Sequence, residues 1–248
     1  MMESWNLKDY YKVLLYGDSI SKGVVYDEDK GRYITLGQNY VTLAQDNLKV
    51  LVQNAAKFGN TILKAITKLP ADILRSEPDI VLMEFGGNDC DFNWEEVANN
   101  PSGQHFPKTE FEAFKSTFKE AINSLHEKNI IPILMTLPPI DADKYFKWIS
   151  QNNSQTAQNI LTYLGSVTRI YWWQERYSSA VVTIAQETKT LWIDVRSAFL
   201  NHPNFTELLC IDGIHPNEKG HALIAQTITD YLKRDYSFLL KTPEPVIE

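Results

Sequence analysis

The sequence predicts an α/β fold in which helices cover both faces of a parallel sheet. Short apolar runs of strand length recur along the 248-residue chain, and segments with helical periodicity separate them. Most of these runs are apolar throughout rather than alternating, as is typical of strands buried on both faces. Because parallel strands need crossover connections, the alternation favours right-handed β–α–β units in a single domain, residues 1–248.

The expected elements alternate along the whole chain. Strands are predicted at Lys12–Tyr16, 49–56, Asp79–Phe85, 129–139 and 190–195. Helices are predicted at Gly37–Asn47, Ala65–Ser76 and Glu110–Lys128 and from Pro216 onward. The third helix has Phe111, Phe114, Phe118, Ile122 and Leu125 at helical spacing.

Two segments exceed the usual length of a loop, residues 90–107 and 141–178. The first carries Trp94 and the second is rich in aromatic residues, and long loops in compact domains commonly form binding walls. We therefore expect them to border a substrate site, with Trp94, Trp172 and Trp173 as candidate contacts. The alternatives are that the aromatic segment 141–178 is buried in the core or forms a homo-oligomer interface.

Charge and hydropathy exclude several classes of partner. The net charge of −7 and the pI near 5.3 disfavour binding to nucleic acid or to an anionic membrane surface. The chain has no apolar run of membrane-spanning length, so stable membrane insertion is not expected. Its polar N-terminus lacks the features of a secretory signal, which predicts a cytoplasmic protein.

The chain has two cysteines, Cys90 and Cys210, which are too few for a disulfide framework or a cysteine-based zinc site. Two isolated buried thiols are the favoured interpretation. Each cysteine lies beside a polar motif, however, so a neighbouring pair with a redox role is the alternative.

Four polar clusters follow predicted strands or can be brought to the same edge of the sheet. They are 17–19, 54–60, 86–89 and the stretch "DGIHPNEKGH" at 212–221. Ligands of open parallel sheets bind at the carboxyl ends of the strands, so four clusters at one edge predict a site.

Ser19 ends the first strand on a turn that exposes its hydroxyl, and a serine nucleophile needs a base. Of the five histidines, His215 alone has a carboxylate well placed to orient it, Asp212, three residues earlier. His221 is predicted on the exposed side of the closing helix. The alternative interpretation is that Asp212 caps a helix and His215 lies on the surface.

A serine acyl-transfer site also needs donors for an oxyanion. The Asn88 side-chain amide, the Gly59 backbone N–H and the Ser19 backbone N–H are the candidates. Asn88 and Gly59 are equally compatible with ordinary turns.

These motifs together resemble the SGNH, or GDSL-type, hydrolases. The matching stretches are "YGDSISKG", "NAAKFGNTI", "FGGND" and "DGIHP", which occur in the family's order from residue 16 to residue 216. Isoleucine replaces the leucine of the first motif. The resemblance implies a three-layer α/β/α, flavodoxin-like sandwich with a five-stranded parallel sheet. It also implies Ser19 as nucleophile, His215 as base, Asp212 as its partner, and an oxyanion hole of Ser19, Gly59 and Asn88.

The predicted activity is hydrolysis of a carboxylic ester through an acyl-enzyme, without metal or cofactor. The favoured substrate is a small molecule with a short acyl group, such as acetyl on a carbohydrate, and Asp18 is a further candidate substrate contact.

Lysophospholipase or thioesterase activity on the same triad is one alternative. A phosphate- or nucleotide-binding flavodoxin-like module is another, since "GDSISKG" opens a helix, although Asp18 opposes anion binding there. A metal-dependent phosphoesterase is disfavoured by the scarcity of histidine among the candidate ligands.

Overall fold

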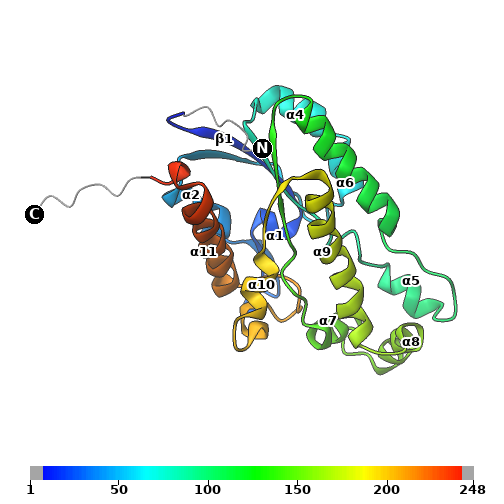
Figure 1. Cartoon of the computed structure of the whole chain (residues 1–248). Coiled ribbons are helices and arrows are strands. Elements are labelled where there is room, and N and C mark those ends of the chain that lie inside the picture. Colours follow the sequence, from blue (N-terminus) through cyan, green and yellow to red (C-terminus); the bar gives the residue numbers. More distant parts are fainter. Residues whose placement is uncertain (1–7, 242–248) are drawn as a thin grey trace, which may run out of the picture.

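The computed structural model describes residues 8–241 and has an open parallel sheet at its centre (Figure 1). The strands are β1 (Tyr11–Gly17), β4 (Val50–Asn54), β5 (Ile80–Glu84), β6 (Ile131–Met135) and β7 (Leu191–Ile193). They lie in the order β4-β1-β5-β6-β7, and every pair is parallel. Numbered along the chain this order is 2-1-3-4-5, that of flavodoxin. The predicted fold class is therefore confirmed.

Two layers of helices cover the sheet and bury separate cores (Figure 1). One face carries α3 (Ile62–Ile66), α4 (Leu69–Ser76), α6 (Phe111–His126) and α9 (Thr168–Thr188). The other carries α2 (Tyr40–Asn47), α10 (Val195–Leu200) and α11 (Glu218–Asp235). Adjacent residues of a strand pack into opposite cores: Leu14 lies in the first core and Leu15 in the second. Both side chains are fully buried, as the continuous apolar run predicts.

The segment 141–178 is mainly helical, which corrects its prediction as a loop, whereas 90–107 is a loop that carries one short helix. Together they contain α5 (Trp94–Asn99), α7 (Ala142–Ile149), α8 (Ser154–Leu164) and the start of α9. The side chains of Asn93, Asp141 and Asn153 cap the first three of these helices. Aromatic and aliphatic side chains from these helices form a third apolar cluster. The aromatic composition thus reflects a small core of its own as well as the walls of a cavity.

The structure differs from the prediction in two further places, the helix at 65–76 and a hairpin after Ser19. The helix predicted at Ala65–Ser76 is divided into α3 and α4, because Pro70 has no N–H to continue a helix and instead begins a new one. An antiparallel hairpin of β2 (Val24–Asp27) and β3 (Arg32–Thr35) follows the first helix, α1 (Ser19–Lys22), and was not predicted. Two short 3-10 helices, η1 (Phe205–Leu208) and η2 (Ser237–Leu239), lie on either side of α11 in the chain.

The sheet order places a crevice between β1 and β5. The chain reverses its direction of strand addition at these two strands, and the loops that follow them therefore diverge. Ser19 follows β1 and Asn88 follows β5. In residues 8–241 no helix has the length and apolar character needed to cross a bilayer.

Candidate active site

Ser19, His215 and Asp212 form a hydrogen-bonded chain at the carboxyl edge of the sheet. The Ser19 Oγ lies 2.8 Å from His215 Nε2, and His215 Nδ1 lies 2.6 Å from Asp212 Oδ2. All three residues are buried. The structure therefore brings together the three residues predicted as nucleophile, base and orienting carboxylate, which lie 196 and 3 positions apart in the sequence.

The turn from Asp212 to His215 fixes the orientation of the imidazole. Asp212 Oδ1 accepts hydrogen bonds from the backbone N–H of Ile214 at 3.0 Å and of His215 at 3.1 Å. Gly213 has a φ of 76°, and a Cβ there would lie 2.6 Å from the carbonyl oxygen of Asp141. A side chain at this position is thus disfavoured by the backbone conformation and would also clash with Asp141.

Asp212 is held as a carboxylate although it is fully buried. Burial alone would raise its pKa, but the hydrogen bond from His215 and those from two backbone N–H groups bring the pKa below its usual value. The hydroxyl of Tyr33 also donates to Asp212 Oδ2 at 3.0 Å. Tyr33 comes from the unpredicted hairpin and is a site residue that sequence reasoning missed.

The predicted oxyanion donors line the same cavity as Ser19. Gly59 has a φ of 68°, with open space where a Cβ would stand, so its backbone is accessible. Asn88 Nδ2 donates one hydrogen to Asp18 Oδ2 at 3.0 Å, which leaves its second hydrogen available. Asn54 secures the glycine loop, since its Nδ2 donates to the carbonyl of Ser21 and its Oδ1 accepts from Ala56 N–H.

A sequence model of the GDSL-like lipase/acylhydrolase family matches residues 15–223. The chain belongs to that family. The resemblance seen in the four motifs is therefore confirmed, and the protein is a carboxylic ester hydrolase.

Individual relatives agree with this assignment. The hydrolase is 24% identical over 227 residues to an acetylxylan esterase of Geobacillus stearothermophilus, across 87% of this chain and 90% of that protein. It is 29% identical over 159 residues to the GDSL esterase/lipase CPRD49 of Arabidopsis thaliana, across 63% of this chain and 55% of that protein. The match thus spans just over half of the plant protein. A crystal structure of a lipase/acylhydrolase from Enterococcus faecalis has the same fold, with a TM-score of 0.64, 20% identity and coverage of 93% of this chain and 97% of that one.

The start of α1 is not a free anion site in this hydrolase. Asp18 caps the helix with its own side chain, since Asp18 Oδ1 accepts from Ile20 N–H at 2.9 Å. Its second oxygen is engaged by Asn88, so both oxygens of this predicted substrate contact already have donors within the protein. The helix has only four residues, and a carboxylate at its N-terminus repels phosphate. The phosphate-binding alternative is therefore not supported.

His221 is fully buried, which corrects its predicted exposure. It stacks on the ring of Tyr40, and its Nδ1 accepts from the Tyr40 backbone N–H at 3.4 Å. Burial, together with the nearby His215, lowers the pKa of His221 to about 4. This side of α11 packs on α2 and not on solvent, so His221 is neutral at neutral pH.

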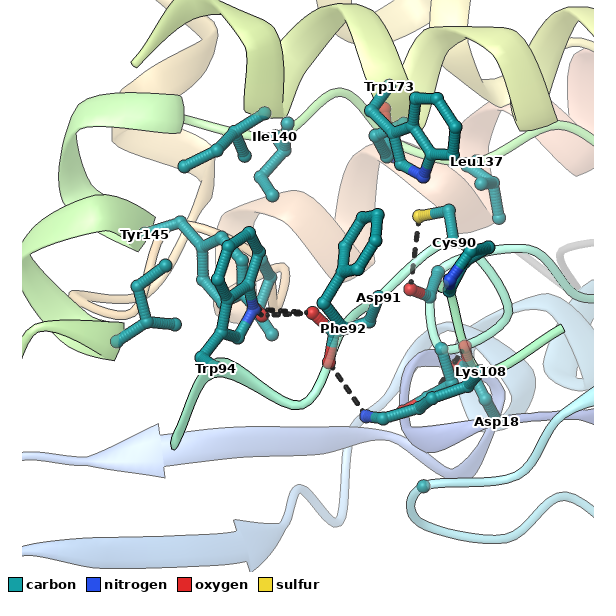
Figure 2. A pocket seen from close by; sticks show the side chains of 18 of the residues that line it. Asp18, Cys90, Asp91, Phe92, Trp94, Lys108, Leu137, Ile140, Tyr145 and Trp173 are labelled. Atoms are coloured by element: carbon teal, nitrogen blue, oxygen red, sulfur yellow. Dashed lines mark hydrogen bonds and ion pairs between the residues drawn. The ribbon is translucent and has the colours of Figure 1, made fainter. Parts of the chain in front are cut away.

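A cavity of about 650 Å³ opens above Ser19 and extends along α7, α8 and α9. Figure 2 shows Trp94 and Tyr145 on one side of this cavity and Trp173 and Cys90 on another. Asp91 fastens the first side: its Oδ1 accepts from Tyr145 OH at 2.6 Å and from Trp94 Nε1 at 2.7 Å, and its Oδ2 pairs with Lys108 Nζ at 2.7 Å. The walls are therefore fixed by a hydrogen-bonded carboxylate as well as by packing.

The candidate aromatic contacts separate into two groups. Trp94 and Trp173 line the cavity, whereas Trp172 does not and is 51% exposed. Trp172 instead lies beneath the guanidinium groups of Arg169 and Arg176, at 5.9 and 5.5 Å from its ring centroid. Among the other aromatic lining residues, Phe92, Phe106, Tyr145, Trp148 and Tyr163 come from the two segments predicted as walls. Tyr33, Phe58 and Phe111 lie outside those segments and were not predicted.

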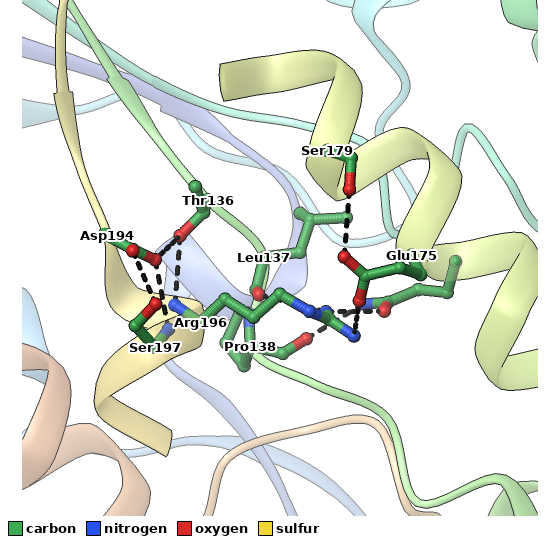
Figure 3. A network of polar contacts seen from close by, with 9 residues as sticks. Thr136, Leu137, Pro138, Glu175, Ser179, Asp194, Arg196 and Ser197 are labelled. Carbon is green, nitrogen blue, oxygen red and sulfur yellow. Dashed lines mark hydrogen bonds and ion pairs between the residues drawn. The ribbon is translucent and has the colours of Figure 1, made fainter. Parts of the chain in front are cut away.

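A buried arginine joins the loop after β6 to α9 (Figure 3). Arg196 Nη1 donates to Gln174 Oε1 at 2.8 Å and to the carbonyl of Leu137 at 3.4 Å, and Nη2 pairs with Glu175 at 2.5 Å. Gln174 Nε2 in turn donates to the carbonyl of Pro138 at 2.9 Å. Leu137 and Pro138 line the cavity, so this network holds one of its walls.

Cys90 and Cys210 are both buried and free, as the favoured interpretation of two buried thiols expects. Burial raises the pKa of the Cys90 thiol well above its usual value and that of Cys210 to about 11. Neither thiol is thus activated as a nucleophile. Among the described residues, no three His, Cys, Asp or Glu side chains are grouped to hold a metal ion.

Proposed function

We propose that the enzyme hydrolyses its ester through a covalent acyl-enzyme on Ser19. The observation that carries this proposal is the pair of contacts made by His215, 2.8 Å to the Ser19 hydroxyl and 2.6 Å to the Asp212 carboxylate. One imidazole nitrogen is thereby fixed against a carboxylate, and the other faces a hydroxyl that opens on a cavity.

In the first half-reaction His215 Nε2 takes the proton of Ser19 as Oγ attacks the ester carbonyl carbon. The carbonyl oxygen becomes an oxyanion, which the N–H groups of Ser19 and Gly59 and the free hydrogen of Asn88 Nδ2 stabilise. Each such donor contributes on the order of 3 kcal/mol to the transition state. The carbon–oxygen bond to the alcohol then breaks, and His215 gives the proton to the departing oxygen.

In the second half-reaction a water molecule takes the place of the alcohol. His215 removes its proton, the resulting hydroxide attacks the acyl carbon, and the proton returns to Ser19 Oγ as the acid leaves. Asp212 stays ionised throughout and stabilises the imidazolium in both halves. Its lowered pKa is consistent with this role.

We further propose that the substrate is a short acyl ester, such as acetyl, on a carbohydrate. The cavity walls include the aromatic rings of Tyr33, Trp94, Tyr145 and Trp148 among aliphatic side chains such as Ile140 and Leu164. Aromatic rings suit the apolar faces of sugars. The similarity to an acetylxylan esterase supports the same choice.

The test compares four substrates with the wild-type enzyme: acetylated xylo-oligosaccharide, p-nitrophenyl acetate, p-nitrophenyl octanoate and a lysophospholipid. We expect kcat/KM to be highest for the acetylated sugar and to fall from acetate to octanoate. A preference for octanoate or lysophospholipid would overturn the substrate proposal but leave the acyl-enzyme intact. An acyl-CoA included as a fifth substrate tests the thioesterase alternative directly.

A further inference from the structure

Two buried carboxyl groups, Asp18 and Glu84, interact with each other, and Asp18 directly precedes the nucleophile Ser19 in the chain. Asp18 follows β1 and Glu84 ends β5, and the register of the two strands pairs Gly17 with Glu84. Asp18 is 1% exposed and Glu84 is 0% exposed. Among residues 8–241 neither forms an ion pair with a lysine, an arginine or a histidine within 4.0 Å, whereas the buried Asp212 pairs with His215 at 2.6 Å.

The hydrogen bonds of the two carboxyls are unequal. Asp18 has a donor on each oxygen, Ile20 N–H at 2.9 Å and Asn88 Nδ2 at 3.0 Å. Glu84 Oε2 accepts from Ser21 Oγ at 2.9 Å, but Glu84 Oε1 is buried and has no donor. Two adjacent buried carboxylates cannot both be ionised at neutral pH, and the one with fewer donors takes the proton.

The groups around the pair supply no compensating cation. Ser21 Oγ, which contacts Glu84, is in turn 2.8 Å from the hydroxyl of Tyr40, and that ring stacks on His221, which is neutral. The remaining titratable neighbours are Asp89, a buried acid, and His215, whose charge acts on Asp18 while its ring nitrogens contact Asp212 and Ser19. The imidazolium formed during the reaction is thus the one positive charge that approaches the pair from the described residues.

We propose that Glu84 is protonated in the working enzyme and donates a hydrogen bond to Asp18, so that Asp18 keeps one negative charge and orients Asn88 for the oxyanion. Glu84 is therefore a positioning residue that acts through Asp18. The inference rests on the proposed role of Asn88, but the protonation of Glu84 can be measured without any substrate.

Because the neutral form of Glu84 is the functional one, the activity should depend on pH in one direction. Burial, followed by the charge of Asp18, raises the pKa of Glu84 well above its usual value, so the proton is present at acidic and neutral pH. It is lost as the pH rises through that raised pKa. A second charge then repels Asp18, and activity falls on the alkaline side.

The first experiment is infrared difference spectroscopy of wild type and Glu84→Gln at neutral pH. We expect a protonated carboxylic acid band in the wild type that is absent from the variant. The same band should disappear at high pH. Equal spectra for the two proteins at neutral pH would overturn the proposal whatever the enzymatic mechanism.

The second experiment is a set of kinetic measurements on p-nitrophenyl acetate. Glu84→Gln keeps a donor of the same shape, so we expect kcat within about threefold of wild type and a weaker alkaline decline. Glu84→Ala removes the donor and should lower kcat about 30- to 100-fold with little change in KM, a fraction of the loss expected for an oxyanion donor. A Glu84→Gln variant as impaired as Glu84→Ala would contradict a neutral donor.

The third experiment places Glu84→Ala in an Asn88→Ala background. If Glu84 acts through Asn88, its effect on kcat should shrink to a few-fold once Asn88 is gone. Full additivity of the two losses would show that Glu84 does not position this donor. Should Glu84→Ala fail to fold, the Gln variant and its infrared spectrum still decide the protonation state.

Discussion

The phenolic hydroxyl of Tyr33 donates a hydrogen bond of 3.0 Å to Asp212 Oδ2, the oxygen that also contacts His215. A residue of the β2–β3 hairpin thereby secures the carboxylate of a turn nearly 180 positions later. The Tyr33 ring also packs at 5.1 Å from that of His215. The hairpin is thus part of the active site and not an incidental excursion of the chain.

Replacing Tyr33 by phenylalanine should lower kcat about ten- to 100-fold, since a hydrogen bond to a charged group contributes about 1.5–3 kcal/mol. The ring contacts stay. Because the lost donor favoured the ionised carboxylate, the pKa of Asp212 should rise. The active carboxylate form is lost as the pH falls, so the acidic limb of the kcat/KM profile should move to higher pH. Tyr26→Phe, in the same hairpin, is the control, and an unchanged limb in Tyr33→Phe would contradict this role.

Replacing Asn88 by alanine should lower kcat by about 10²- to 10³-fold with KM nearly unchanged, because an oxyanion donor acts mainly in the transition state. Steady-state kinetics on p-nitrophenyl acetate measure this directly. Asn153→Ala, which removes the cap of α8 on an exposed surface, is the control for a loss of asparagine alone. A rise in KM at constant kcat would instead make Asn88 a substrate contact.

Gly213 and Gly165 form a matched pair for testing the turn that carries His215. Both have positive φ, 76° and 75°, but a Cβ at Gly213 would lie 2.6 Å from Asp141 O, and one at Gly165 meets nothing within 4 Å. Alanine at Gly165 should reduce the free energy of unfolding by about 1 kcal/mol and leave activity intact. Alanine at Gly213 should reduce the free energy of unfolding by more than alanine at Gly165 does, and it should lower kcat at least tenfold. If urea denaturation and kinetics gave the same effects for both variants, the close contact between a Cβ at Gly213 and Asp141 would have no consequence.

Arg196→Met should loosen the wall formed by Leu137 and Pro138. The variant leaves the Gln174 amide oxygen and a backbone carbonyl without their donor, at a cost of about 1–3 kcal/mol. The expected fall in Tm is about 5 °C for a chain of this size. KM should rise more than kcat falls. Arg234→Met, at an exposed pair with Asp235, should change neither quantity.

Much of the fold and of the triad could be predicted because the relevant signals are local. Apolar runs that end in glycine mark β1 and β5, and the Asp212–His215 spacing is that of a single turn. Sequence order alone also placed these turns at one edge of a parallel sheet.

The parts that were missed depend on contacts between distant segments. From the sequence, Glu84 is predicted only as the polar end of a strand, and its partner Asp18 lies 66 positions earlier, directly after the neighbouring strand β1. Tyr33 lies in a short hairpin whose docking against residue 212 has no local signal. The helices within 141–178 begin at the caps Asp141 and Asn153, and this signal is weak beside the unusual length of the segment, which favours a loop. A homo-oligomer through that segment and the cytoplasmic location stay predictions.

The most direct test of the central claim is hydrolysis of p-nitrophenyl acetate by wild type and Ser19→Ala, each with and without a metal chelator. The serine mechanism predicts wild-type turnover that the chelator does not change, and a loss of at least about 10⁴-fold in kcat in the variant at an unaltered Tm. Turnover that persists in Ser19→Ala, or that the chelator abolishes in the wild type, would contradict it.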